Sequence, residues 1–526
     1  MANPEIAERF ARFKGKRGLV MGLGLWQGGV EAVKFLHRWG ASEIVVTDLR
    51  DEKTLAPSLE AIRHIPVTLR LGEHHEADFA QAQVVIHSPA VRPDNKYLVA
   101  AREAGAEVTQ EMSLFIEACP AKTVGITGSN GKTTTTLLCY EMLCEVYQRA
   151  QPELENKWAD PVANPQTKGP RVWLGGNVGT PLINRLEEIT KDDVVVLELS
   201  SFQLMDWHRI EKSCDVALIT NITPNHLDWH KDFEEYVWAK SAIYRYSPTD
   251  WVIFNLTNDA LCRLARERLP GPIGFDQWTP RVFSFAQDDR PWGQRDGTGQ
   301  PVRLVWDEQG SVRLDPEFDL ADRDNQFPAT RSDLRLPGEF NWLNALGAIA
   351  ACIGVVHSTR KAKAFCSAGL KRFRGVEHRL EPCGEINGAR IFNDSIATDP
   401  AATLAALSAF DKGVHLILGG GSKNIDYTEL GKRIATHGGI KAIYLQGTTA
   451  PAIKAAVGAT YMSPLHECAT FDEACERAFK ALTPGDVLLM SPASTSFYEY
   501  APGKKFANFE ERGKHFKALV AKYSKA

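Results

Sequence analysis

Short apolar runs alternate with amphipathic segments along the first third of the chain. Residues 17–24, 42–48 and 83–90 are apolar runs ending in turn-forming or polar residues, and residues 30–40 have the spacing of a helix closed by Gly40. Strands that alternate with helices are typical of βαβ units and a parallel sheet. The pattern therefore predicts an α/β fold that begins close to the N-terminus.

The same alternation occurs twice more. Strands are expected within residues 122–136, 193–204, 215–223 and 251–255, and a third series begins near Val376, with strands within 389–394, 414–421, 441–447 and 486–493. Runs of Val, Ile and Leu bounded by turn residues are typical of strands buried on both faces. Residues 150–170 and 286–333 are rich in polar residues and turn formers, so both are interpreted as surface insertions or loops.

Composition narrows the class of protein. The 526 residues are 44% hydrophobic and 24% charged, with a formal net charge of −4, so no global basic field indicates nucleic acid or a membrane surface. No apolar run is long enough to span a membrane, and the polar N-terminus lacks the apolar core of a signal peptide. Ten scattered cysteines without a CxxC pair indicate reduced thiols in the cytoplasm.

The strongest local signal is TGSNGKTTTT, from Thr127 to Thr136. It follows an expected strand and precedes an expected helix, as a phosphate-binding loop does. Backbone amides would surround phosphates, Lys132 would reach the terminal phosphates and the Thr133 hydroxyl would hold Mg²⁺. Ile126 stands where the strict GxxxxGK[ST] template has its first glycine.

A weaker glycine loop lies near the N-terminus. Gly22 and Gly24 fit a GxGxxG motif, but Gln27 occupies its third glycine position. Asp48 ends the next strand, where a ribose-binding carboxylate sits in such units, although a strand-end turn residue explains it equally well. A dinucleotide and another nucleotide diphosphate both remain open as ligands. A nicotinamide dehydrogenase would rest on this loop alone, and the second phosphate loop argues against it.

Polar residues follow two strands of the second region. Glu198, Ser200 and Gln203 come after one apolar run, and His226 follows another. Ligands of doubly wound sheets bind beyond the carboxyl ends of strands. Oxygen ligands with an occasional imidazole suit Mg²⁺. Glu198 and His226 are therefore candidate magnesium ligands beside the phosphate loop, although a lone histidine is more often structural.

Several segments resemble those of the Mur ligase family, in that family's order. They are TGSNGKTTTT, LELSSFQL, NITPNHLD, LPGEFNWLNALGA, FRGVEHRLE, NDSIATDPAAT, LILGGGSKNIDY and SPASTSF…NFEERG. LELSSFQL and the last pair are most similar to the branch that joins D-glutamate to UDP-N-acetylmuramoyl-L-alanine in peptidoglycan synthesis. The DNPR-type motif of a related branch does not occur here.

The resemblance implies a cytoplasmic ATP-dependent amide ligase with three domains, and a monomer is the default expectation for its oligomeric state. Residues 1–119 would form a Rossmann-like domain for the UDP substrate, 120–377 a central P-loop ATPase domain, and 378–526 a Rossmann-like domain for the amino acid. ATP would phosphorylate the substrate carboxylate, and the amine of D-glutamate would attack the acyl phosphate. Positioning and charge neutralisation suffice for such phosphoryl transfer.

The resemblance also implies a role for each matched residue. ATP would contact Gly128, Ser129, Asn130, Gly131, Lys132, Thr133, Thr134, Asn341, Asn344, Arg379 and Asp394. Two Mg²⁺ ions would be held by Thr133, Glu198, His226 and Lys240, with Lys240 carbamylated. The UDP substrate would contact Leu25, Asp48, Leu49, Arg50, Ser88, Asn177, Ser200 and Gln203, and the amino acid Lys423, Ser496, Phe497 and Phe509. The catalytic residues would be Lys132, Glu198, His226 and Lys240.

The chain departs from the family pattern near two of these sites. Ile396 replaces a lysine and Asp399 replaces an asparagine in NDSIATDP, and the segment between Phe497 and NFEERG is longer than usual. Because that segment borders the expected amino-acid pocket, an acceptor other than D-glutamate is an alternative. An L-glutamate-adding ligase, a folate-type polyglutamyl ligase and a non-catalytic homologue are the rival interpretations.

Overall fold

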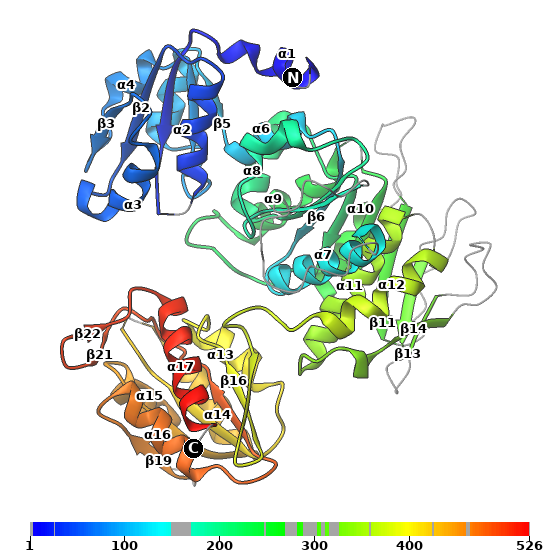
Figure 1. The fold of residues 1–526 in the computed structure, drawn as a ribbon, viewed down its shortest axis with the longest axis vertical. Coiled ribbons are helices and arrows are strands. Elements are labelled where there is room, and N and C mark those ends of the chain that lie inside the picture. The colour runs from blue at the N-terminus through cyan, green and yellow to red at the C-terminus, as the bar shows by residue number, and fades with distance from the viewer. Residues whose placement is uncertain are drawn as a thin grey trace. The chain divides into compact units, whose positions relative to one another are not determined.

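The computed structural model describes residues 4–25, 27–148, 170–246, 249–268, 281–287, 302–306, 311–314, 326–356, 359–422, 425–458 and 463–524. The chain divides into two compact units. The first contains residues 1–331 and 343–370, and the second contains residues 332–342 and 371–526. Each unit is built on parallel sheet covered by helices (Figure 1).

The first sheet of unit 1 is parallel and has the order β3-β2-β1-β4-β5. Its strands are β1 (Arg17–Met21), β2 (Glu43–Asp48), β3 (Thr68–Leu71), β4 (Val84–His87) and β5 (Glu107–Thr109). The helices of this region are α1 (Pro4–Phe10), α2 (Gly28–Arg38), α3 (Glu52–Ile62), α4 (Glu76–Gln81), α5 (Lys96–Glu103) and α6 (Glu111–Ala118). The strands expected within 17–24, 42–48 and 83–90 and the helix at 30–40 are confirmed.

The second sheet of unit 1 has nine strands in the order β14-β13-β12-β11-β10-β9-β6-β8-β7. They are β6 (Lys122–Thr127), β7 (Val172–Gly176), β8 (Val194–Glu198), β9 (Val216–Ile219), β10 (Trp251–Asn255), β11 (Arg281–Gln287), β12 (Val302–Trp306), β13 (Ser311–Leu314) and β14 (Gln326–Thr330). Its helices are α7 (Lys132–Gln148), α8 (Ser201–Ile210), α9 (Phe233–Arg245), α10 (Asp259–Arg268), α11 (Glu339–Val356) and α12 (Thr359–Arg372).

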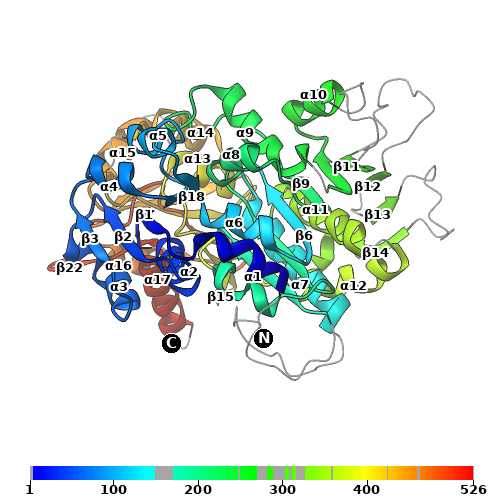
Figure 2. The same ribbon diagram turned by 90° about the horizontal axis from the view of Figure 1, so that it is seen from above.

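One expectation about this region is wrong. Residues 286–333 were interpreted as a surface insertion, but β12, β13 and β14 lie within them and extend the sheet beyond β11. Figure 2 shows these strands in succession along one edge. The last two pair antiparallel, as edge strands of a mixed sheet often do. The insertion expected at 150–170 lies almost wholly outside the described residues.

Unit 2 is built on a six-stranded sheet of order β15-β16-β20-β17-β18-β19, parallel except for β15. Its strands are β15 (Glu381–Ile386), β16 (Ala389–Asn393), β17 (Val414–Leu418), β18 (Ile440–Leu445), β19 (Leu465–Glu467) and β20 (Val487–Met490), with a hairpin of β21 (Glu499–Ala501) and β22 (Lys504–Lys505). Its helices are α13 (Pro400–Leu407), α14 (Thr428–Thr436), α15 (Ala450–Val457), α16 (Phe471–Ala481) and α17 (Phe509–Tyr523).

Side-chain caps determine where several helices begin. Asp51 accepts from Thr54 N at 2.8 Å before α3, and Asp232 accepts from Glu235 N at 2.7 Å before α9. Such a cap satisfies one of the amides left without a partner in the first turn and stabilises a helix by about 1 kcal/mol. The helix starts are therefore encoded locally by short polar residues.

Apolar packing joins the first two sheets within unit 1. One core cluster contains Val20 and Ile86 of the first sheet together with Val195 and Ala217 of the second. The regions expected to be the first and second domains therefore lie in one compact unit, and the three-domain division stays a prediction. Unit 2 has core clusters on either side of its own sheet.

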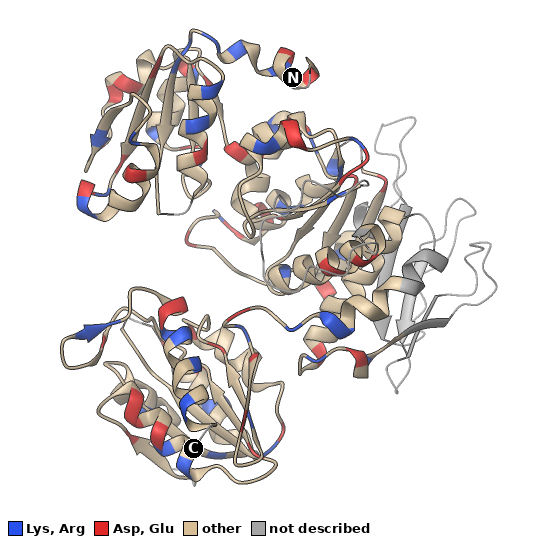
Figure 3. Ribbon diagram, viewed as in Figure 1, with Lys and Arg blue, Asp and Glu red and all other residues tan. Residues whose placement is uncertain are grey.

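Charged residues of both signs occur throughout the described chain, and one long helix is strongly apolar. Figure 3 shows basic and acidic residues interspersed along the helices of both units. Among the described residues, α11 is the one helix with the length and composition of a membrane span, and 78% of its window is buried within the fold. All ten cysteines are free and none is fully exposed.

Candidate functional site

The TGSNGKTTTT segment forms a tight loop between β6 and α7. Gly128 and Gly131 have φ angles of 149° and 80°, which L side chains rarely adopt. A Cβ on Gly128 would lie 2.0 Å from Thr220 Oγ1, and a Cβ on Gly131 would lie 2.2 Å from Asn344 Oδ1. Glycine is therefore required at both positions, and Asn344 of α11 lies directly against the loop.

Hydrogen bonds hold the loop in place. The Ser129 hydroxyl is 2.8 Å from both Thr223 O and the Tyr236 hydroxyl, and the Asn130 amide donates to Asn221 Oδ1 at 2.9 Å. These contacts come from the loop after β9 and from α9. The loop is therefore fixed before any ligand binds, as a preorganised phosphate site requires.

Lys132, Thr133 and Thr134 begin α7, so they lie at the positive end of the helix dipole. The Lys132 ammonium donates to Gly128 O and Ser129 O, each at 3.0 Å. The side chain thus folds over the loop whose amides are predicted to surround phosphate. Thr134 is buried, whereas Thr133 is partly accessible.

Lys240 lies in the interior close to this loop. Its side chain comes from α9, is 1% exposed and donates to Thr127 Oγ1 at 3.2 Å. Burial holds the pKa of Lys240 well below its ordinary value, the nearby Lys132 charge lowers it further, and Glu198 opposes the shift. The structure therefore brings Lys132, Glu198 and Lys240 together, and the surroundings of the Lys240 amine favour its neutral form.

Glu198 ends β8 beside them. Asn177 Nδ2 donates to Glu198 Oε1 at 3.3 Å, whereas Oε2 is buried without a hydrogen-bond partner in the described part of the chain. A buried carboxylate oxygen with no donor is costly unless a cation or a protonated group meets it. Its chemistry therefore fits a hard cation such as Mg²⁺.

His226 lies in the loop after β9, and its φ of 54° is unusual for a residue other than glycine. Its ring packs edge-on against Phe202, with centroids 4.9 Å apart. The residue is exposed, but neighbouring groups desolvate its ring in part, and this lowers the pKa of His226. The charges of Lys132 and Lys240 lower it further. A neutral imidazole is the form that binds metal.

Among the described residues, no group of three or more His, Cys, Asp or Glu side chains is arranged for a metal. Glu198 and His226 would therefore need other ligands, such as the Thr133 hydroxyl, phosphate oxygens and water. That donor set suits Mg²⁺, which usually keeps several waters and binds through phosphates.

Five of the eight residues predicted to contact the UDP substrate lie at or just after the carboxyl ends of β1, β2 and β4. We call this set the substrate edge; it consists of Leu25, Asp48, Leu49, Arg50 and Ser88. Leu25 and Leu49 are 52% and 67% exposed, so two apolar side chains project into solvent there. Exposed apolar side chains beside buried polar ones are typical of a ligand surface.

Asp48 itself is buried and accepts hydrogen bonds from the glycine loop after β1 and from the segment after β2. Its Oδ2 accepts from the Gly24 amide at 2.9 Å, and its Oδ1 accepts from the Arg50 amide at 2.9 Å. The carboxylate therefore fixes the glycine loop. A contact between Asp48 and a ligand stays a prediction.

Ser200 and Gln203, also predicted to face the UDP substrate, are engaged with each other. The Ser200 hydroxyl accepts from Gln203 N at 3.2 Å, and Gln203 Oε1 accepts from Ser200 N at 2.9 Å. This is a capping box at the start of α8. The S-x-x-Q spacing in the sequence already signals it.

In unit 2, Asp394 follows β16 and lies close to Arg379. Its Oδ1 accepts from Leu380 N at 3.1 Å and its Oδ2 from the Ser491 hydroxyl at 2.7 Å. Burial raises the pKa of Asp394 to about 7, against the effect of these hydrogen bonds. Asp394 therefore links the β16 and β20 ends.

The residues predicted to bind the amino acid are distributed around the same sheet edge. Phe497 is 66% exposed and follows the buried Ser496, and the bridge between Gly421 and Thr495 joins their segment to the loop after β17. Phe509 begins α17, where its carbonyl accepts from the Ser395 hydroxyl at 2.7 Å. Lys423 lies outside the described residues.

Three family models match the chain in succession. They are the Mur ligase MurD-like N-terminal domain over residues 16–110, the Mur ligase middle domain over 126–277 and the Mur ligase glutamate ligase domain over 378–494. A relative from Acetivibrio thermocellus, named UDP-N-acetylmuramoylalanine--D-glutamate ligase, is 36% identical, and the match covers 98% of this chain and 99% of that one.

The chain belongs to the Mur ligase family. A relative of the same name from Roseiflexus sp. is 35% identical over 97% of this chain and 99% of its own. The solved structure of MurF ligase from Thermotoga maritima in complex with ADP has a TM-score of 0.51 and 15% identity, covering 98% of this chain and 96% of that one. At that identity the likeness concerns the Mur ligase fold alone.

Arg512, within the NFEERG motif of this Mur ligase, was not singled out from the sequence. It is 0% exposed, and its guanidinium donates to Ser395 Oγ at 3.0 Å, Ser395 O at 2.8 Å, Ser494 O at 3.0 Å and Thr495 O at 3.1 Å. It thus ties the loop after β16 to the loop after β20. Burial lowers its pKa to about 10, so it stays charged at neutral pH.

The two substitutions within the NDSIATDP segment have different surroundings. Asp399 is exposed and caps α13 by accepting from Ala402 N at 2.9 Å, a role that asparagine also performs. Ile396 is partly buried, and its amide donates to His378 O at 3.1 Å.

Asn341 and Asn344, the predicted adenine contacts, lie three residues apart in α11. Asn344 adjoins the phosphate loop, as described above. The Asn341 side-chain amide donates to Pro337 O at 2.7 Å within unit 2. The boundary between the compact units therefore passes between these two asparagines.

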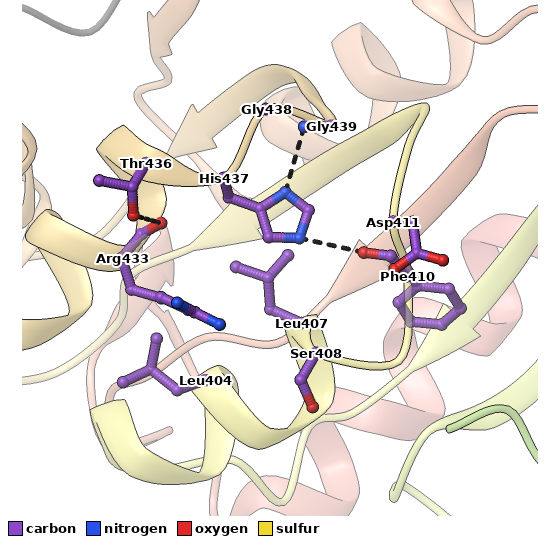
Figure 4. Close-up of a pocket in the computed structure, with 10 residues that line it drawn as sticks. All are labelled: Leu404, Leu407, Ser408, Phe410, Asp411, Arg433, Thr436, His437, Gly438 and Gly439. Carbon is purple, nitrogen blue, oxygen red and sulfur yellow. Dashed lines mark hydrogen bonds between the residues drawn. The ribbon is translucent and has the colours of Figure 1, made fainter. Parts of the chain in front are cut away.

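A cavity of about 330 Å³ opens elsewhere in unit 2 (Figure 4). It is lined by Leu404, Leu407, Ser408, Phe410, Asp411, Arg433, Thr436, His437, Gly438 and Gly439. The His437 ring spans it, with Nε2 3.0 Å from Phe410 O and Nδ1 3.3 Å from the Gly439 amide. The cavity lies at the amino ends of β17 and β18, away from the predicted site residues.

Proposed function

We propose that this chain is an ATP-dependent amide ligase that adds D-glutamate to UDP-N-acetylmuramoyl-L-alanine in the cytoplasm, as a monomer. The observation that carries the proposal is the rigid phosphate loop beside Glu198, His226 and Lys240, in a chain similar over almost its whole length to ligases of that name.

ATP would bind with its phosphates against the amides of residues 128–134. Lys132, now bonded to Gly128 O and Ser129 O, would exchange those carbonyls for phosphate oxygens, which are stronger acceptors. Asn344 lies against the loop, which supports its role in holding the nucleotide. Asn341, Arg379 and Asp394 would complete the ATP contacts.

Mg²⁺ would supply charge neutralisation for the transferred phosphoryl group. Thr133, Glu198 and His226 are the side chains that would hold it, and the buried Glu198 Oε2 without a donor supports this assignment. A second ion would share the site with Lys240 as its carbamate.

Carbamylation suits the surroundings of Lys240. A neutral Lys240 amine would attack the carbon of CO₂, form a C–N bond and release a proton to solvent, which converts a neutral amine into an anionic carbamate. The depressed pKa of the amine favours the reactive neutral form. The resulting carbamate would no longer repel Lys132 and would approach a metal ion as a ligand.

The chemistry then needs two displacements. The substrate carboxylate attacks the γ-phosphorus of ATP, and ADP leaves with the electron pair of the broken P–O bond. The D-glutamate amine attacks the acyl phosphate through a tetrahedral intermediate that expels phosphate. The substrate edge with Asn177 would hold the UDP substrate, and Lys423, Ser496, Phe497 and Phe509 would bind D-glutamate.

The decisive experiment offers ATP, Mg²⁺ and UDP-N-acetylmuramoyl-L-alanine with D-glutamate, L-glutamate or L-alanine in separate reactions. Phosphate release and product mass are measured together. Release with D-glutamate alone, with the matching gain in mass, is expected. Release with L-glutamate would keep the ligase but reverse the acceptor, and no release would overturn the proposal.

A further inference from the structure

Trp229 connects the loop of His226 to the substrate edge. Its indole N–H donates to Ala90 O at 2.9 Å. Ala90 is two residues from Ser88, and the turn between them is closed by Val91 N to Ser88 O at 3.0 Å and Ala90 N to Ser88 Oγ at 3.4 Å. A ligand that binds the Ser88 hydroxyl would therefore affect the turn whose Ala90 carbonyl accepts the hydrogen bond of the Trp229 indole.

The Trp229 ring also contacts one residue from the first-sheet region, Arg92, and one from the second-sheet region, Phe202. The Arg92 guanidinium carbon lies 5.1 Å from the centroid of the Trp229 ring, and Arg92 Nη1 donates to Trp229 O. On the other side, the Phe202 ring lies 4.6 Å from the Trp229 ring. A cation over an indole face is attractive and fixes the ring plane.

The same tryptophan supports His226 directly. Trp229 N and His230 N donate to His226 O at 3.0 and 2.9 Å, so the backbone turns back onto His226. His226 has a positive φ, which costs free energy and persists only where surrounding contacts impose it. Phe202, which packs on Trp229, also packs on the His226 ring.

We propose that Trp229 is a positioning residue that couples occupancy of the substrate edge to the orientation of His226, through Ala90 and Arg92. This inference rests on the proposed function. It adds that UDP-N-acetylmuramoyl-L-alanine and the magnesium nucleotide bind cooperatively because one rigid indole serves both loops. By linkage, each ligand must then tighten the other by the same factor.

The experiment measures this coupling by calorimetry without D-glutamate, so that no turnover occurs. The non-hydrolysable nucleotide AMP-PNP with Mg²⁺ is titrated in the absence and presence of UDP-N-acetylmuramoyl-L-alanine, and the reverse titration checks reciprocity. The substrate is expected to tighten nucleotide binding about fivefold or more in the native protein. Trp229→Phe, which keeps a ring but lacks the N–H donor, should reduce that factor to less than twofold.

Trp238→Phe is the matched control. Trp238 is an exposed tryptophan of α9 that stacks on His208 at 3.5 Å, and none of its contacts in the described residues is with Ala90. It should keep the full factor. Arg92→Met is a second variant that removes the guanidinium over the ring but leaves the indole in place, and it should also weaken the coupling.

The outcomes separate the two proposals. If the native protein binds neither AMP-PNP nor the UDP substrate, the proposed function fails. If it binds both without mutual tightening, or if Trp229→Phe keeps the native factor, the positioning role is wrong and the ligase assignment stands. Loss of coupling in Trp229→Phe and Arg92→Met, but not in Trp238→Phe, supports the inference.

Discussion

Each compact unit contains a buried basic side chain, and the two differ in the number of hydrogen-bond acceptors around them. Arg512 of unit 2 donates four hydrogen bonds to three residues, Ser395, Ser494 and Thr495. Its pKa, lowered by burial to about 10, still leaves it charged at neutral pH. This guanidinium is compensated, so its charge serves to connect two loops.

Lys240 of unit 1 has far fewer partners in the described residues. It donates to the Thr127 hydroxyl and lies 4.6 Å from the centre of the Tyr236 ring, while Lys132 acts against its charge. Incomplete solvation of a buried amine favours its neutral, nucleophilic form. The comparison teaches that burial alone does not define a cation's role, because the number of acceptors around it decides whether it remains charged.

The largest expected effect is that of Lys240→Met on catalysis. Removal of a group that stabilises developing charge in a phosphoryl-transfer site lowers kcat by about 10²–10³-fold, whereas the melting temperature should not fall, because an uncompensated buried amine is removed. Phosphate release and differential scanning calorimetry measure the two quantities. A variant that keeps native kcat would show that Lys240 is merely structural.

The next effect is that of Arg512→Met on stability. Ser395 O and Ser494 O would lose their donor in the interior, whereas Thr495 O would keep the Gly421 amide. The free energy of opening of unit 2 should therefore fall by about 3 kcal/mol. Hydrogen exchange of amides in α17 measures that opening. Arg433→Met, an exposed arginine of α14, is the control and should change stability by less than about 0.5 kcal/mol. If Arg512→Met and Arg433→Met changed the stability equally, Arg512 would not be the connecting residue that its contrast with Lys240 implies.

A smaller effect concerns pH. Since the pKa of Lys240 is depressed in the folded protein, the unfolded chain binds more protons below the ordinary lysine value of 10.5, and stability should rise with pH towards that value. One proton contributes at most about 1.4 kcal/mol per pH unit. Urea unfolding of the native protein and Lys240→Met from pH 7 to 9, with CO₂ excluded, should give a difference that grows with pH. A constant difference would mean that Lys240 is charged when folded.

The smallest expected effect on stability is that of substitutions at Asp399, whose exposed carboxylate is compared with the buried charges. Asp399→Ala removes the cap of α13 and should cost about 1 kcal/mol, whereas Asp399→Asn keeps an acceptor and should cost a few tenths. Urea midpoints of both variants test this. A large loss in Asp399→Asn would show that the negative charge itself matters at this position.

Much of the fold is predictable because its signals are local. The apolar runs that become β1, β2, β6 and β8 are bounded by glycine or polar residues, and the phosphate loop needs glycine at Gly128 and Gly131 for reasons of φ and close approach. The strands β12 to β14 were missed because their short apolar runs are separated by polar and turn-forming residues. Their pairing depends on distant partners, which a local pattern does not contain.

The motifs of the candidate site were predictable from the sequence, but the burial and hydrogen-bond partners of each residue were not. Arg512 looks like a solvated helix residue in NFEERG, and only contacts across more than a hundred residues with Ser395 bury it. The family resemblance assigns Ser200 and Gln203 to the UDP substrate, and in the structure they form the capping box of α8. Burial and partner choice are long-range properties, so sequence spacing leaves them undetermined.

The free cysteines provide a built-in reporter of opening. Cys383, Cys468 and Cys475 belong to unit 2 and the other seven to unit 1, and burial raises the thiol pKa of Cys214 and Cys475 well above its ordinary value. Such thiols react slowly with alkylating reagents until their surroundings separate. Brief alkylation followed by peptide mass spectrometry would therefore record, unit by unit, which part of the molecule exposes its interior first.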